Sequence, residues 1–455
     1  MMINTPMNIK ISLILLLLIL PMNVKAQSNE TPIVLTLDKA IDIALNKNYD
    51  IQLAQYDKLE ADAQITEAYA GAYPDIKFNG QYTRNLKPQV LFLPPNTPFN
   101  PGPTTQTLSL GADNSYNIGA SLSQTIYDPR LGTAITIAKK YNQYSELNSE
   151  STEDYVRADV KNAFYGVLLS RKLVDVNEQS YEVAKANYKN TTLLYQQGVS
   201  SEYDLLRSQV QLANVEPALI EAKNNYELSK NNLKNLLAID LATPILVEGN
   251  FEVDKISDAL LLKSDNILSE RNPMLQSLAV QKEILDENID IEKAAYLPTL
   301  KAFGNYNWQA EDNTFKFKDY NWANTITVGL TLSYNIFDGF ERKAKIEQAE
   351  IDAKRLDVQK IQAEEGLKIS LLQSKLKMNE ALERINAQKQ SVNQAEKALS
   401  IAQNRYSNGV GTQLEILDTQ NSLTQTRINY ERAVYDFLIA ETEWERILSV
   451  TDTNE

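Results

Sequence analysis

Apolar residues along the chain follow two different periods. In long stretches they recur every three or four residues, as on one face of a helix, and in four shorter stretches they alternate with polar residues, as in a strand. The pattern predicts one order of elements twice: helix, strand, strand, long helix, turn, helix. In the first half the expected helices are 36–71, 130–197 and 200–238, with strands at 75–84 and 114–127. In the second half the expected helices are 265–296, 340–406 and 411–449, with strands at 299–309 and 324–337.

The two halves also match residue by residue. Asn-x-x-x-Gln at 48–52 recurs at 272–276, and Tyr-x-x-Gly-Val at 195–199 recurs at 406–410. The offset between matches drifts slightly, as insertions and deletions in loops would cause. We therefore interpret the chain as a tandem duplication. Its parts are a first repeat at 27–239, a linker at 240–264 that reads as loop with a short strand, a second repeat at 265–450 and a tail at 451–455.

The long helices carry a seven-residue period. In the second half it runs through Met378, Ile385, Val392, Leu399 and Tyr406. A strict heptad over several turns favours left-handed supercoiling against a neighbouring helix. The helix expected at 130–197 would be ~100 Å long at 1.5 Å per residue. The two shorter helices of that half have nearly the same summed length, so we expect them to stack end to end along it.

The alternating stretches have the pattern of membrane strands. Residues 325–337, TITVGLTLSYNIF, alternate without interruption, and neither 114–127 nor 324–337 contains a charged residue. A sheet packed on a soluble core gives similar alternation, but aromatic residues near the predicted strand ends suit an interfacial girdle: Tyr82, Tyr306, Trp308 and Trp322. Four strands cannot close a barrel, and an open edge is not viable in lipid, so a chain with these strands in a membrane must oligomerise.

Composition excludes several classes of function. Residues 1–26 have the pattern of a secretory signal, with Lys10 before an apolar run and Ala26 at the expected cleavage site. The chain has no cysteine and no histidine, which removes disulfides, the usual zinc and haem ligands, and His-based catalysis. The formal net charge of −14 argues against a nucleic-acid partner. With no P-loop and no metal-ligand pattern, we expect neither a cofactor nor an enzyme.

Four stretches resemble the outer membrane efflux protein family, the TolC-like channels. They are LTLDKAIDIALNKNYDI at 35–51, AYPDI at 72–76, AYLPTL at 295–300 and YSNGVGTQLEILDTQ at 406–420. The resemblance implies a mainly α-helical fold with membrane β-strands: a homotrimer whose 12-stranded outer-membrane barrel continues as a long coiled-coil α-barrel in the periplasm. It implies a passive exit duct of a tripartite efflux or type I secretion system. Its partners would be the lipid bilayer, a periplasmic adaptor protein and an inner-membrane transporter.

The resemblance also assigns roles at the two helix-turn-helix tips. Gly198 and Gly409 would be the reversal glycines, since glycine adopts backbone angles that strain other residues. Glu415 and Asp418 match the family's aperture carboxylates and would form an acidic pore constriction. Asp204 and Tyr406 match residues that latch the closed tip.

The chain departs from the family at the basic latch residue, where it has Gly411. Either the latch is looser here, or Arg207 or Gln413 substitutes for the missing side chain. The sequence therefore does not decide whether the aperture is closed at rest. Another reading of Glu415 and Asp418 is that they are ordinary solvated helix charges.

Three further questions stay open. A pore-less periplasmic coiled-coil scaffold, or an adaptor protein, would share the heptads but would need neither the alternating strands nor two tandem hairpins. Drugs, metal ions, siderophores and polypeptides all leave through such ducts, so the cargo is not assigned. The proline-rich loop at 86–104 lies outside the cell in the family's topology. It could fold over the mouth, meet a surface partner or be disordered.

Overall fold

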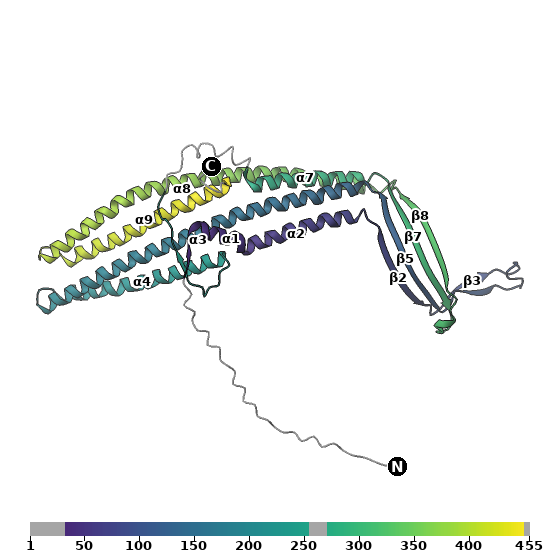
Figure 1. Ribbon diagram of the computed structural model, residues 1–455, viewed down its shortest axis with the longest axis horizontal. Helices are drawn as coiled ribbons and strands as arrows, with labels where there is room; N and C mark the ends of the chain where they lie inside the picture. The colour runs from purple at the N-terminus through teal and green to yellow at the C-terminus, as the bar shows by residue number, and fades with distance from the viewer. Residues whose placement is uncertain (1–31, 254–270, 450–455) are drawn as a thin grey trace, which may run out of the picture.

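A long bundle of helices ends in one β-sheet (Figure 1) in the computed structural model, which describes residues 32–253 and 271–449. Two antiparallel hairpins form most of the bundle. One pairs α3 (Pro129–Gln196) with α4 (Glu202–Leu236), and the other pairs α8 (Glu341–Ser407) with α9 (Gln413–Leu448). The hairpins pack against each other through α3 and α9. The predicted signal segment, the tail and residues 254–264 of the predicted linker lie outside the described residues.

Shorter helices continue each hairpin toward the sheet. One helix was predicted at 36–71, but the chain forms α1 (Leu37–Lys47) and α2 (Tyr49–Ala70), because Asn48 between them has a non-helical backbone with ψ of 142°. In the second half, α7 (Pro273–Ala294) corresponds to α2. The short strands β1 (Ile33–Leu35) and β6 (Ile245–Val247) pair in parallel, which ties the start of the described chain to the linker.

A buried asparagine joins a pair of helices end to end in each repeat. Asn48 caps the first turn of α2, and its side-chain amide donates to the Leu236 carbonyl at the end of α4, at 2.9 Å. Asn272 caps α7 and donates to the Ile447 carbonyl at the end of α9, at 2.8 Å. The two asparagines are 3% and 4% exposed. Each therefore satisfies backbone groups of two helices at once, so that the α4–α2 and α9–α7 pairs form jointed rods.

The apolar core gathers around these junctions rather than at the ends of the bundle. Val160 and Phe164 of α3 pack with α1, β6 and the end of α4, while Phe437 and Trp444 of α9 pack against α8. Tyr165 contacts both clusters. The described hairpin tips contain only a small core cluster, made of Leu399, Ala402, Ile416 and Leu423. The middle of the bundle is therefore its best-packed region.

Four strands form one antiparallel sheet in the order β2-β5-β7-β8, with β2 and β8 at its unpaired edges. Their bounds are Asp75–Arg84, Asn114–Tyr127, Thr299–Asp312 and Ala323–Ser333. All four were predicted, although β7 runs three residues further than expected and β8 ends four residues earlier. β8 ends at Ser333 because its partner β7 begins at Thr299, directly opposite, so the residues that follow have no β7 partner. The chain then turns into α8 through Gly339 and Phe340, both of which have positive φ.

The register places the apolar side chains of all four strands on one face. Phe78 pairs with Ala120, which pairs with Tyr306, which pairs with Ile326. These side chains are open to the surroundings: Phe78 is 76% exposed and Val328 is 78% exposed. The other face is mainly polar. Its large apolar side chain is Phe303, whose ring covers Gly329 so closely that a Cβ there would lie 2.7 Å from it. The predicted alternation is thus present as one continuous apolar surface.

Aromatic side chains gather at the end of the sheet farthest from the helices. The rings of Tyr116, Phe317, Tyr320 and Trp322 form contacts with centroids at most 6.4 Å apart, and the ring of Trp308 contacts Trp322 in a tilted arrangement at 6.4 Å. Beyond them, the segment between β2 and β5 forms a second, two-stranded sheet of β3 (Gln89–Leu93) and β4 (Gln106–Leu110). Of the three possibilities left open for the loop at 86–104, disorder therefore does not describe its first strand. Among the described residues, no helix is both long and apolar enough to cross a membrane.

Replacing the junction asparagines tests whether they hold the bundle together. We expect Asn272→Ala to lower the free energy of unfolding by about 2–3 kcal/mol, because it removes a helix cap and leaves the buried Ile447 carbonyl unpaired. Asn48→Ala should act alike in the first repeat. Far-UV circular dichroism during denaturant unfolding measures the effect. Asn46→Ala, at an exposed position of α1, is the control and should change little; equal midpoints for all variants would contradict the assignment.

A carboxyl in the seam between the hairpins makes stability depend on pH. Burial raises the pKa of Glu431 on α9, with nearby Asp175 adding to the rise and Lys172 opposing it. A carboxyl with a raised pKa costs the folded state stability at neutral pH, and this cost disappears as the pH falls toward the ordinary value of 4.5. Glu431→Gln should therefore raise the melting midpoint at neutral pH and lose that advantage on acidification. Glu221→Gln, at an exposed position of α4, should show no such pH dependence.

Candidate functional site at the helical tips

The chain reverses direction at two turns of the same design. Gly198 has φ of +72° between α3 and α4, and Gly409 has φ of +75° between α8 and α9. After each glycine, a valine amide returns to the last helical turn: Val199 to the Leu194 carbonyl at 2.8 Å, and Val410 to the Arg405 carbonyl at 3.0 Å. Glycine is suited to this left-handed backbone because it has no Cβ.

A capping residue starts the returning helix at each turn. Ser201 accepts a hydrogen bond from the Asp204 amide at 3.1 Å, and its hydroxyl donates to the Asp204 carboxylate at 2.7 Å. Thr412 accepts from the Glu415 amide at 3.3 Å. The acidic residue six positions after each glycine is therefore the third residue of a helix, where a carboxylate favours both the cap and the helix dipole. The repeated motif has a local structural role in addition to any role in a pore.

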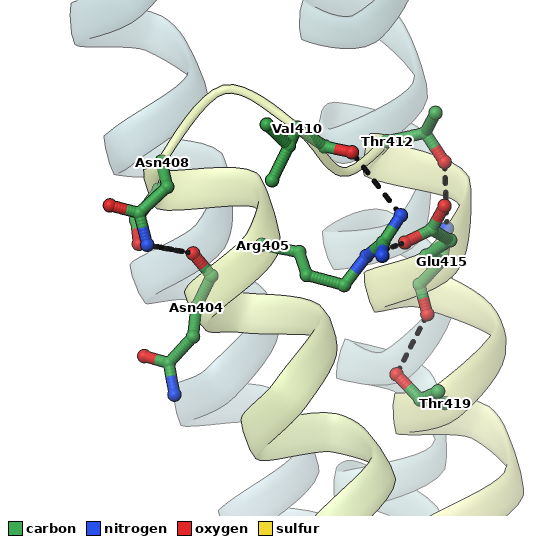
Figure 2. Close-up of polar contacts among 8 residues, drawn as sticks. Asn404, Arg405, Asn408, Val410, Thr412, Glu415 and Thr419 are labelled. Carbon is green, nitrogen blue, oxygen red and sulfur yellow. Dashed lines mark hydrogen bonds and ion pairs between the residues drawn. The ribbon is translucent and has the colours of Figure 1, made fainter.

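Arg405 closes the second turn from within the same chain. Figure 2 shows its guanidinium lying between the turn and the start of α9. One nitrogen donates to the Val410 carbonyl at 3.2 Å, and another forms an ion pair with the Glu415 carboxylate at 3.3 Å. Both side chains are about half exposed, so the pair adds little to stability. Its main effect is on charge, because the positive Arg405 stands next to one of the two candidate aperture carboxylates.

The turn leaves no space for the family's basic latch residue. A Cβ on Gly411 would lie 2.8 Å from the Tyr406 amide nitrogen and 2.9 Å from Arg405 Cβ. Neither expected substitute takes over the ion pair within the described residues. Arg207 packs over the ring of Tyr203, and Gln413 is buried with both of its side-chain polar atoms unpaired. Arg405, which no motif in the sequence had indicated, forms the ion pair instead.

The remaining predicted residues lie near the tips but do not meet within one chain. Asp418 is exposed, one helical turn after Glu415, and makes no hydrogen bond or ion pair with the described residues. Tyr406 is half-buried against Leu399 and its neighbours in the tip cluster. No hydrogen bond joins Asp204 to Tyr406 in the described part of the chain. A latch between these two residues would therefore need a different arrangement of the hairpins or a second copy.

Polar contacts join the two hairpins above their tips. The buried Gln420 amide donates to the Ser180 carbonyl at 3.0 Å, and Gln211 donates to Asn421 at 2.9 Å. Gln209 of the first repeat corresponds to Gln420 of the second, and this match between the repeats is the feature of the sequence that could have pointed to Gln420. In the residues that the structure describes, no group of acidic side chains is placed to hold a metal ion. The site is thus two helix turns of the same design, each followed by a carboxylate.

These features together define a class of protein. Two tandem helical hairpins continue into a four-stranded sheet whose apolar face is exposed, and both hairpins end in glycine turns with carboxylates. This is the architecture of an outer membrane channel of the TolC type.

Comparison with known proteins agrees with this class, and the chain belongs to the outer membrane efflux protein family, which it matches at residues 40–238 and 266–449. Outer membrane protein TolC of Escherichia coli is 23% identical over 367 residues, covering 74% of this chain and 73% of TolC. The alkaline protease secretion protein AprF of Pseudomonas aeruginosa is 22% identical over 343 residues, covering 73% of this chain and 69% of AprF.

A solved structure shares the fold. The CmeC outer membrane channel of Campylobacter jejuni superposes with a TM-score of 0.72 at 18% identity, covering 90% of this chain and 85% of CmeC. The protein is therefore an efflux channel of the outer membrane with its helical part in the periplasm, in a family of transport ducts rather than enzymes.

Substitutions at the reversal glycines test the strain at the tips. Gly409→Ala should destabilise the second tip by about 1–2 kcal/mol, because an L-residue is strained at this positive φ. Gly366→Ala is the matched control: Gly366 lies inside α8, and a Cβ added there would meet nothing within 4 Å, so alanine should stabilise the helix. Hydrogen exchange of peptides spanning 400–415 should rise only in Gly409→Ala. Unchanged exchange there would mean that the turn is not held in this conformation.

Proposed function

We propose that three copies of this chain form one continuous exit duct, a 12-stranded β-barrel joined to a coiled-coil α-barrel. The observation that carries the proposal is the pair of unpaired sheet edges, β2 and β8, on opposite sides of the same chain. Edge pairing of β2 with β8 of the next copy would repeat head to tail, and such contacts close into a ring. A closed ring leaves no strand edge open to lipid.

The helices at the edges support the same assembly. Contacts give the order α2-α3-α7-α8 near the sheet, which follows the strand order β2-β5-β7-β8. The outermost helices expose apolar side chains at helical spacing. They are Tyr49, Leu53 and Tyr56 on α2, and Ile351, Val358 and Leu372 on α8. Packing α2 of one copy on α8 of the next would bury both stripes in the same contact that pairs the strands, at about 25 cal/mol per Å² of apolar area.

The hairpin tips would surround the narrow periplasmic end of the duct. Glu415 and Asp418 are our proposed constriction, and Asp204 and Tyr406 the proposed latch between neighbouring copies. Arg405, Glu415 and Asp418 sum to +1 − 1 − 1, or −1 per copy. Three such clusters in a narrow aperture attract cations and exclude anions. The charge that selects ions is thus carried mainly by Asp418, since Arg405 offsets Glu415.

An adaptor protein and an inner-membrane transporter would dock at this end and supply the energy, because a passive duct has no energy source of its own. The proposed system is tripartite efflux or type I secretion. Similarity to AprF, an alkaline protease secretion protein, supports secretion, and membership of the outer membrane efflux protein family supports efflux.

Conductance in planar bilayers tests the duct and its aperture together. Wild type should give cation-selective steps. Asp418→Asn should reduce the shift in reversal potential under a salt gradient, and Arg405→Gln should increase it, because each changes the aperture by one charge per copy. The double variant Arg405→Gln/Glu415→Gln keeps the wild-type net charge and should keep its selectivity.

Glu383→Gln is the control, since it removes an exposed carboxylate of α8 away from the tip. Selectivity that follows overall charge rather than these positions would contradict the aperture. A folded oligomer that never conducts, even after the latch is weakened by Tyr406→Phe, would favour a pore-less scaffold.

A further inference from the structure

The arm formed by β3 and β4 is the least polar exposed part of the chain. It leaves the far end of the sheet and points away from the helices (Figure 1). Residues 88–112 contain no charged side chain, although 23% of the whole chain is charged. A protein surface that meets only water seldom lacks charge over such a length, so the arm is expected to be covered in the assembled protein.

The strand register divides the arm into two unequal faces. Leu91 pairs with Leu108, and the flanking pairs on the same face are Gln89 with Leu110 and Leu93 with Gln106. We call these four leucines, 91, 93, 108 and 110, the leucine face. The opposite face pairs Val90 with Ser109 and Phe92 with Thr107, so each of its pairs includes a hydroxyl. The leucine face is therefore the side that gains most from being covered.

Both ends of the arm are held by hydrogen bonds. At its base, the Asn85 side chain donates to the Ala112 carbonyl at 2.8 Å, which fixes the arm to the end of the sheet. At its tip, Asn100 has no exposed surface, and its amide donates to the Leu93 and Thr104 carbonyls at 2.9 and 2.8 Å. Five prolines between 94 and 103 stiffen this tip, and Phe99 beside the asparagine is 83% exposed. A two-stranded sheet is marginally stable alone in water, so a structure this fixed points to further packing.

We propose that the leucine face packs against the same face of neighbouring copies, so that the arms form an apolar cap over the outer mouth of the duct. This inference rests on the proposed assembly of several copies around one axis. The arm connects β2 with β5, and β2 is the sheet edge at which the next copy would join. Each arm would therefore lie next to a boundary between copies, where it could contact the arms of the other copies.

The absence of charge favours a second copy of the arm, rather than lipid or another protein, as the partner of the leucine face. Identical segments brought together on a symmetry axis repel if they carry net charge, and residues 88–112 carry none. A lipid surface is disfavoured, because the arm points away from the sheet end and has no lysine or arginine to reach lipid headgroups. A foreign protein partner would not need the segment to be free of charge. In the capped state the leucines are covered, and passage of cargo requires the arms to separate.

Cysteine crosslinking tests the cap cleanly because the chain contains no cysteine of its own. Leu91→Cys, on the leucine face, should form covalent dimers with a short bis-maleimide in the purified protein. Phe92→Cys is the matched control, one residue along the same strand, exposed, and on the opposite face. We expect crosslinking at 91 to be roughly tenfold faster or more than at 92, because the arms raise the effective concentration of the facing thiols. Adding Leu108→Asp to Leu91→Cys should slow the reaction to the rate of the control.

Light scattering of the same samples separates the possible failures. An oligomer that does not crosslink at 91, or that crosslinks faster at 92, would overturn the cap and leave the proposed duct intact. A protein that is monomeric in detergent and in bilayers would overturn both. A cap that forms should also lower conductance, so Leu108→Asp alone should increase the fraction of time that single channels spend open.

Discussion

A strand edge cannot remain unpaired in lipid, and this constraint governs the whole molecule. The described sheet has two free edges and one exposed apolar face, so a single copy would leave apolar side chains in water or unpaired backbone groups in lipid. The constraint explains why the helices keep the same lateral order as the strands. Only then can the same neighbour that pairs with an edge strand also cover the apolar stripes on α2 and α8. In the proposed assembly, strand pairing and helix packing are thus two parts of one contact.

The two equivalent asparagines, Asn48 and Asn272, join shorter helices into long rods. A duct through the periplasm needs very long rods, and α3 and α8 supply two of them as single helices of 68 and 67 residues. The other two rods are assembled from pieces, and each joint exposes backbone groups at two helix ends. Asn48 and Asn272 satisfy both ends with one buried amide. The largest apolar clusters lie around these joints, so the bundle is well packed in the middle and lightly packed at the tips, where the proposed aperture would need freedom to move.

At the tips, the residues that start the returning helices are also those of the proposed aperture. Ser201 and Thr412 cap the two returning helices by accepting from the amides of Asp204 and Glu415, whose carboxylates face the end of the proposed duct. Three positions after a cap, each carboxylate has a fixed place along its helix. Arg405 then adjusts the local charge from within the same chain, where Gly411 has no side chain and no room for one.

The sequence alone determined the elements, the repeat and the family. Period-two and heptad patterns are local, so they located the four strands and the long helices, and the recurrence of Gly198 as Gly409 marked the two turns. The tertiary structure decided what depends on distant groups. It split the first helix at Asn48, because that side chain bonds to Leu236, 188 residues away. It replaced Arg207 and Gln413 by Arg405, since only the path of the turn brings that guanidinium to Glu415. It also ordered the proline-rich loop into an arm with a leucine face, which no single residue in the loop would have indicated.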